Sequence, residues 1–267
     1  DGRRIAVDLA DGEIYVMNAD GTEITNLTNH PAADAFPAWS PDGTRIAFHS
    51  NRDGNSDVFV MNADGSDPLN LSNHPADDVL PAWAPDGRLA FVTDRDGNNE
   101  IYVMNADGSA PVNLTVNEAS DQVPAWSHDG QRIAFNSDRR GLYNELFVMN
   151  ADGGNPAVVD LGPVVADFPK WSPDDSWIAF GGGTGADPEI MIVHPDGTGL
   201  TNLSKNPAQD RYPAWSPPGR PGPLGLWECH FYIPIVRRPC RRRVQVSAVH
   251  LRGCHGAGPA DEDRDGR

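Results

Sequence analysis

The sequence has few cysteines, few lysines and no long apolar run. Its three cysteines, Cys229, Cys240 and Cys254, are too few for the disulfide framework of a small secreted scaffold. No apolar stretch approaches the roughly 18 residues that a membrane-crossing helix needs. Lys and Arg number 21 against 38 Asp and Glu, a formal net charge of −17. We therefore expect no nucleic-acid binding and no membrane insertion.

Motifs of the common enzyme classes are also missing. The sequence has no G-x-S-x-G nucleophile elbow, no H-E-x-x-H pair and no phosphate-binding loop. The Gly-rich segment Gly181–Gly185 (GGGTG) is interpreted as a flexible hairpin, because no helical pattern follows it. We expect a non-enzymatic protein with no certain cofactor. The chain opens without the Met, basic residues and apolar core of a signal peptide.

What the sequence does have is turn residues and a repeat. The 27 glycines and 24 prolines argue against a helical bundle and for many short elements. The string PAWSPDG or a close variant recurs with a period of about 44 residues, and a string like VMNADG lies at a fixed distance behind most copies. The repeated tryptophans are Trp39, Trp83, Trp126, Trp171 and Trp215.

Each repeat is predicted to form four short antiparallel strands. PAW lies in the first strand and the following Pro-Asp-Gly forms a turn. The second strand, Arg45–Ser50 in the repeat that begins at Pro37, is followed by a hairpin in which Gly54 suits a positive φ. The third, Val58–Asn62, is apolar on both faces, which suits a strand between neighbouring sheets. The fourth is polar, as an outer edge should be.

A four-stranded unit of this length predicts a blade of an all-β propeller, because each sheet needs a neighbour on both faces. About five blades are visible within residues 1–216, which we assign as the propeller domain. Three strands at the start and one at the end, Tyr212–Ser216, sum to one blade. Five blades would therefore close by a clasp between the termini. The alternative is a fragment of a six-bladed or larger ring.

These strings resemble the TolB-type, WD-repeat-like propeller family over residues 1–216. The resemblance implies a non-catalytic, protein-binding scaffold of the bacterial cell envelope, periplasmic or extracellular, acting as a monomer. Similar blades form the substrate-gating domain of dipeptidyl-peptidase-type serine hydrolases, so a truncated gating domain is the alternative. A stand-alone propeller lyase would need histidines that converge on the channel, and His49, His128 and His194 belong to different strands or turns.

Residues 217–267 do not follow the repeat. They hold nine arginines, no lysine, five acidic residues and all three cysteines. Such a composition is typical of a GC-rich gene read out of frame, and we favour a frameshift or chimeric tail over a real basic extension that binds an acidic partner. Phe231–Val236 (FYIPIV) has the pattern of a strand. We expect the rest of the tail to be disordered.

An acidic residue precedes each inner strand. In a ring these five carboxylates would surround one mouth of the central channel and attract a basic partner or a cation. The alternative is that each accepts hydrogen bonds from the backbone of its own loop. The five residues are Asp34, Asp78, Asp121, Asp167 and Asp210.

Two hairpins alternate oxygen-bearing side chains around a glycine, a pattern shared with calcium loops. Their candidate Ca²⁺ ligands are Asp53, Asn55, Asp57, Asp94, Asp96, Asn98 and Glu100. Neither hairpin shows the bidentate acid that completes a full calcium loop, and turn chemistry explains the same residues. The NADG turns, the repeated tryptophans and the matched residues His30 and His74 are interpreted as structural.

Overall fold

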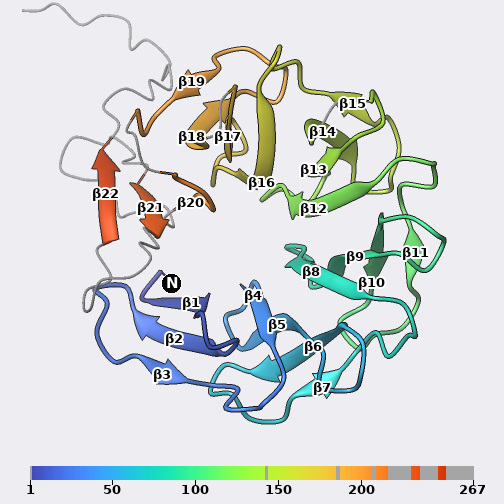
Figure 1. The fold of residues 1–267 in the computed structure, drawn as a ribbon, viewed down its shortest axis with the longest axis vertical. Coiled ribbons are helices and arrows are strands. Elements are labelled where there is room, and N and C mark those ends of the chain that lie inside the picture. The colour runs from blue at the N-terminus through green and yellow to red at the C-terminus, as the bar shows by residue number, and fades with distance from the viewer. Residues whose placement is uncertain are drawn as a thin grey trace, which may run out of the picture.

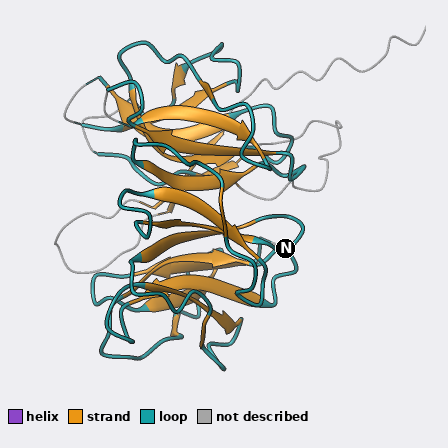
Figure 2. Ribbon diagram, turned by 90° about the vertical axis from the view of Figure 1, so that its right-hand side faces the viewer, coloured by secondary structure: helices purple, strands orange, loops and turns teal. Residues whose placement is uncertain are grey.

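The computed structural model describes residues 2–141, 144–184, 187–205, 209–215, 230–234 and 246–250. This part of the chain is all-β, and its antiparallel sheets stand around a central axis (Figure 1). Seen from the side, the described residues form strands joined by loops (Figure 2). None of them forms a helix with the length and hydropathy needed to span a membrane. The predicted fold, a β-propeller of four-stranded antiparallel blades, is confirmed.

Four complete blades follow one another, each with its strands in sequence order from the axis to the rim (Figure 1). The first contains β4 (Asp34–Trp39), β5 (Arg45–Ser50), β6 (Asp57–Asn62) and β7 (Leu69–Asn70). The second contains β8 (Asp78–Trp83), β9 (Leu89–Thr93), β10 (Glu100–Met104) and β11 (Val112–Asn113). The third contains β12 (Asp121–Trp126), β13 (Arg132–Ser137), β14 (Glu145–Asn150) and β15 (Ala157–Val158). The fourth contains β16 (Val165–Trp171), β17 (Ile178–Gly183), β18 (Glu189–Val193) and β19 (Thr201–Asn202).

The fifth repeat blade is the first in the chain. It has three strands, β1 (Arg4–Asp8), β2 (Ile14–Asn18) and β3 (Thr25–Asn26). The predicted clasp is wrong: the last repeat strand, β20 (Ala214–Trp215), pairs with β21 (His230–Pro234) and not with β1. A third strand, β22 (Val246–His250), completes that sheet, which lies between β16–β19 and β1–β3 (Figure 1).

β20 therefore forms its backbone hydrogen bonds with β21 of the tail and not with β1. A partner close in sequence closes a shorter loop, which costs less conformational entropy than pairing the two ends of the chain. The strand predicted around Phe231 is confirmed by β21. The rest of residues 217–267 was expected to be disordered. That expectation is wrong for Val246–His250, which form β22; the other positions of the tail beyond β21 lie outside the described residues.

The hydrophobic cores lie between blades, as the two-faced apolar strands predict. Phe48 and Phe59 are paired across β5 and β6 and pack, together with Ile46, against Ile14 of the preceding blade. The same arrangement recurs between β4–β7 and β8–β11, where Phe91 packs against Val58. Each blade thus removes a neighbour's apolar face from water, which is why single blades of this kind are not stable alone.

The NADG turns also hold adjacent blades together. Gly108, which ends one of them, has a φ of 82° and lies against the carbonyl oxygen of Leu71 in the preceding blade, where an added Cβ would stand 2.5 Å from that oxygen. Gly65 and Gly153 repeat the contact with Leu27 and Leu114. A positive φ and close backbone approach both require glycine at this position.

Candidate functional site

In the first three complete blades, the aspartate that opens the inner strand is paired with an arginine of its own blade. Arg52 places one guanidinium nitrogen 2.9 and 3.0 Å from the two carboxylate oxygens of Asp34, and its Nε donates to Ser50. Its guanidinium also lies over the Phe59 ring at 4.8 Å. The Asp34 side chain is fully buried, so the aromatic face and the serine complete the cation's surroundings.

The same arrangement occurs in the next two blades. Arg95 binds Asp78 and Arg139 binds Asp121, with N–O distances of 2.8–3.0 Å and buried carboxylates. Three of the five predicted rim residues are therefore neutralised inside the protein. The partner is an arginine side chain and not the loop backbone that the alternative interpretation named. The nearly constant separation of these Asp and Arg residues, 18, 17 and 18 positions in the sequence, was the signal that could have revealed the pairs.

The fourth blade departs from this pattern, and Asp167 is not the fourth member of the ring. In the strand register Ala166 pairs with Gly182 as Asp34 pairs with Ser50, so Ala166 occupies the aspartate position. Asp167 lies one residue further along, where burial raises the pKa of its carboxyl. Asp210, two residues before Tyr212, is buried at the expected position.

The candidate calcium ligands are engaged in hydrogen bonds that join strands and loops. The Asn55 amide donates to the carbonyl oxygens of His74 and Ala76, each at 2.8 Å. Asp57 accepts from Asn70 and Ser72. These bonds fasten the hairpin to the connection that leads into the next blade.

The second hairpin is held in the same way. Asn98 donates to the carbonyl oxygens of Asn117 and Ala119, Glu100 accepts from Thr115, and Asp96 accepts from Tyr102. Asp53 accepts from Asn70, while Asp94 accepts from the backbone of Asp77. Among the described residues, no group of three or more His, Cys, Asp or Glu side chains is arranged to hold a metal ion. Calcium binding stays a prediction.

The histidines are distributed over the ring. His30 and His74 accept, through Nδ1, backbone hydrogen bonds from Ala32 and Ala76 in their loops. His49 accepts from the backbone of Leu80 in the next blade, and burial lowers its pKa. His128 contacts Asp175, and His194 stacks on Trp177 at 3.6 Å. His49, His128 and His194 thus lie in different blades.

The central channel contains a feature that our sequence analysis missed. Five apolar or aromatic residues, each three positions before the tryptophan of its repeat, have a positive φ of 52–59°: Phe36, Leu80, Val123, Phe168 and Tyr212. We call them the channel collar. In β4, β8, β12 and β16 they lie where the register with the second strand shifts. A positive φ is strained for such residues, above all for β-branched Val123.

Aromatic side chains of the channel collar meet across the axis. The rings of Phe36 and Phe168, from the first and fourth complete blades, stack with centroids 5.8 Å apart. Phe168 and Tyr212 are 4.4 Å apart. The sequence signal was the apolar residue before each proline, in FPAW, LPAW, VPAW, FPKW and YPAW.

A pocket of about 80 Å³ lies at the collar, between four inner strands; we call it the channel pocket. It is lined by Phe36, Pro37, Ala38, Leu80, Pro81, Val123, Pro124, Phe168 and Lys170. The position of Lys170 is occupied by alanine in the other inner strands (Ala38, Ala82, Ala125, Ala214). Its side chain reaches the solvent of the channel, yet protein surrounds it, and this desolvation lowers the pKa of its ammonium group.

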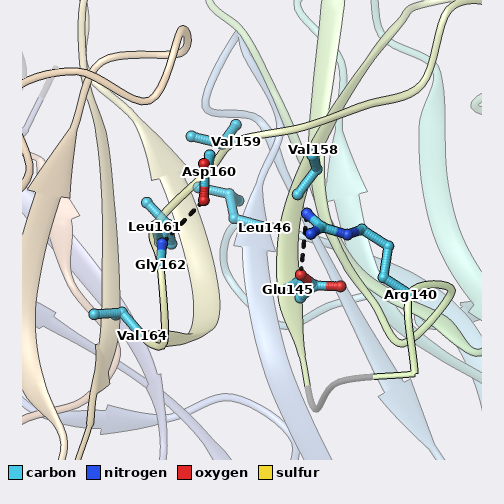
Figure 3. Close-up of a pocket in the computed structure, with 9 residues that line it drawn as sticks. All are labelled: Arg140, Glu145, Leu146, Val158, Val159, Asp160, Leu161, Gly162 and Val164. Carbon is cyan, nitrogen blue, oxygen red and sulfur yellow. Dashed lines mark hydrogen bonds and ion pairs between the residues drawn. The ribbon is translucent and has the colours of Figure 1, made fainter.

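A second pocket, of about 40 Å³, lies in the third complete blade (Figure 3). Here Asp160 replaces the hydroxyl residue that Ser72 and Thr115 supply in other blades, and Arg140 contacts Glu145 at 3.4 Å. Asp160 instead accepts from the backbone of Gly162, pointing away from Glu145 (Figure 3). Glu145 Oε2 is buried without a hydrogen-bond partner among the described residues. The carboxylates do not converge on a common ligand.

Comparison with known families agrees with this geometry. A family model described as the TolB beta propeller domain matches residues 70–221, more than half of the chain. The chain belongs to the TolB beta propeller domain family. A second model, the Tricorn protease N-terminal beta propeller domain, matches residues 2–95. No curated protein matches the chain.

Solved structures show the same fold. TolB from Acinetobacter baumannii is 19% identical with a TM-score of 0.69, over 86% of this chain and 60% of that one. The putative TolB from Agrobacterium tumefaciens is 22% identical with a TM-score of 0.66, over 73% and 74%. A puromycin hydrolase is 16% identical with a TM-score of 0.59, over 83% and 38%. The chain thus spans less than two thirds of two of these proteins.

Proposed function

We propose that the chain is a non-catalytic propeller that binds a protein partner at the mouth of its channel, in the periplasm or outside the cell. The observation that carries the proposal is the contrast between the polar side chains of the hairpins and the apolar channel pocket. The side chains that the sequence suggested for chemistry hold hairpins and blades together, whereas the channel pocket has apolar walls and a single ammonium group. Apolar concave sites with few polar groups are typical of binding.

Family membership supports both the scaffold role and the location, since the family model and two of the similar structures are TolB propellers. Similarity between repeats of this kind predicts a shared fold better than a shared activity, so binding must be measured directly. The test is selection of a displayed random peptide library on the full chain. We expect peptides that bind saturably, with one site per chain, and that compete with one another.

Blocking the channel locates that site. Ala38→Met fills the channel pocket with a side chain about as long as the lysine that β16 carries at the equivalent position. We expect it to lower the affinity of the selected peptides by roughly tenfold. The control is Leu69→Met, on the outer strand β7 where Leu69 is 60% exposed. Absence of saturable peptides, or equal binding to wild type and Ala38→Met, would refute the proposed site.

The second candidate is a gating propeller of a serine hydrolase, favoured by the Tricorn protease propeller match and the puromycin hydrolase likeness. Translating the genomic DNA downstream of codon 216 in all three frames distinguishes the two. An α/β-hydrolase sequence would favour the gating domain, whereas further VMNADG-like repeats would favour a longer propeller and a frameshifted tail.

A further inference from the structure

The charge at the channel pocket is opposite to the one that the sequence suggested. The buried aspartates of the first three complete blades are each neutralised by an arginine. Among the nine described residues that line the channel pocket, Lys170 is the one with a charge. A ligand that enters the pocket therefore meets an ammonium group on an apolar wall and not a ring of carboxylates.

Lys170 has no counter-ion in the described structure. No described carboxylate lies within ion-pair distance of its ammonium group, and burial is the influence that acts on its charge. The neighbouring Asp167 interacts electrostatically with Arg211. The ammonium group is open to the channel and has no counter-ion among the described residues, so an anion that enters the pocket gains an interaction which the described protein does not satisfy.

The size of the pocket limits what can enter. A water molecule needs about 10–15 Å³ of such volume, so 80 Å³ holds roughly six non-hydrogen atoms. An extended peptide does not thread through this space. The side chain of glutamate fits, with its methylene groups against the collar rings and its carboxylate at the ammonium group.

The walls are suited to such an anchor. Phe36 and Phe168 line the pocket and stack on each other, and Tyr212 contacts Phe168 from outside the lining. Phe36 and Phe168 both lie where the register of their strand shifts. A rigid apolar wall lowers the local dielectric, which strengthens an ion pair relative to water. Because the wall is already ordered, association does not bear the entropic cost of fixing these side chains.

We propose that Lys170 anchors an acidic side chain that a protein partner inserts into the channel pocket. This inference rests on the proposed function and names the chemistry of its contact. The overall negative charge of the chain disfavours a broadly acidic partner, so one inserted carboxylate within an otherwise neutral or apolar contact is the arrangement that fits.

The test uses peptides selected on the full wild-type chain. We expect them to share an acidic residue, and both Lys170→Ala and replacement of that residue by its amide to weaken binding roughly tenfold or more. Combining the two changes should add little, because both remove the same ion pair. Lys170→Ala restores the alanine of the other blades, so it should fold. Lys205→Ala is the matched control, since Lys205 is the chain's other lysine and is exposed.

Because the chain has two lysines, NMR can follow the signal of each one separately. After reductive ¹³C-methylation, the signal of Lys170 should shift on peptide binding, whereas that of Lys205 should not. Equal binding to wild type and Lys170→Ala, or selected peptides without acidic residues, would overturn the inference. So would competition by free glutarate as effective as that of the peptide, which would indicate a small-anion site.

The two proposals fail differently. If no peptide binds saturably, the proposed function itself is wrong. If peptides bind and Ala38→Met blocks them while Lys170→Ala does not, the channel is a binding site and the acidic anchor alone is wrong.

Discussion

Two blades of the same ring differ in how they are built. In β8–β11, Arg95 donates to both Asp78 and Thr93 and so forms a network at the start of the inner strand. In β16–β19 the aspartate and threonine positions hold Ala166 and Gly182, and the arginine position falls in the Gly-rich segment. The fourth blade thus lacks all three members of the network, and it is also the blade that carries Lys170 at the channel pocket.

The difference shows that the Asp–Arg network is one structural unit. Removing only the aspartate, only the hydroxyl residue or only the arginine would leave a buried charge or an unpaired hydroxyl. Replacing all three by small residues leaves no buried charge and no unpaired hydroxyl. A blade without the network is held by its contacts with both neighbours. Blades that keep the network are therefore expected to tolerate single changes poorly.

The largest expected effect comes from breaking the network in a regular blade. Arg95→Ala should lower the free energy of unfolding by about 3–5 kcal/mol, because Asp78 is left charged and buried. Arg88→Ala, which removes an ion pair between exposed partners, should cost at most about 1 kcal/mol. Urea unfolding monitored by tryptophan fluorescence measures both. Similar losses for the two variants would contradict the structural role of the network.

A smaller effect is expected where blades meet at the NADG turn. Gly108→Ala should cost about 2–3 kcal/mol, since it combines a strained positive φ with a clash against Leu71. Gly97→Ala is the control for strain alone: its φ is 104° and nothing lies within 4 Å of the added Cβ. Equal melting temperatures for the two variants would show that the inter-blade contact contributes nothing.

Lys170→Ala is expected to change stability in the opposite direction. Its folded-state pKa is lowered from 10.5 by burial, so the folded protein holds this proton less tightly than the unfolded chain does. The variant should therefore be slightly more stable at pH 7, by a small amount because the side chain is open to solvent, and the gain should vanish as pH rises toward 10.5. Thermal melts at pH 7 and 10 test this. A gain that is independent of pH would point to packing and not to charge.

The smallest effect concerns the exposed aspartates of the turns. Hydrogen bonds from Ser40 and Thr44 lower the pKa of Asp42 from 3.8 to about 2, and similar bonds lower that of Asp107. Because the folded-state values are lowered, this contribution is complete above pH 4 and is lost as pH falls toward 2. Thr44→Val removes one of these hydrogen bonds, so the pKa of Asp42 in the folded protein should move up toward 3.8. NMR titration of the Asp42 carboxyl would detect this change.

The repeat in the sequence predicted much of the fold but less of the site. The spacing of Trp39 and its equivalents, with strands apolar on both faces, was sufficient for a propeller, because such sheets have few other ways to bury both faces. The closure was predicted wrongly, since the pairing of β20 depends on which strand competes for it. Asp167 lies four residues before its tryptophan, whereas the other four aspartates lie five residues before theirs. It was misplaced because this offset was interpreted as a shorter blade, and the strand pairing shows instead that Ala166 occupies the aspartate position.

The sequence by itself determined the repeating unit, the turns at Gly65 and Gly108 and the apolar faces, because these follow from local conformation and periodicity. Only the tertiary structure decided which charges cancel and which remain. Asp34 and Arg52 stand 18 residues apart in the chain, and ring closure brings Phe36 and Phe168 from separate blades to one axis. Electrostatics and channel shape depend on distances in space, and these exist only once the blades have packed.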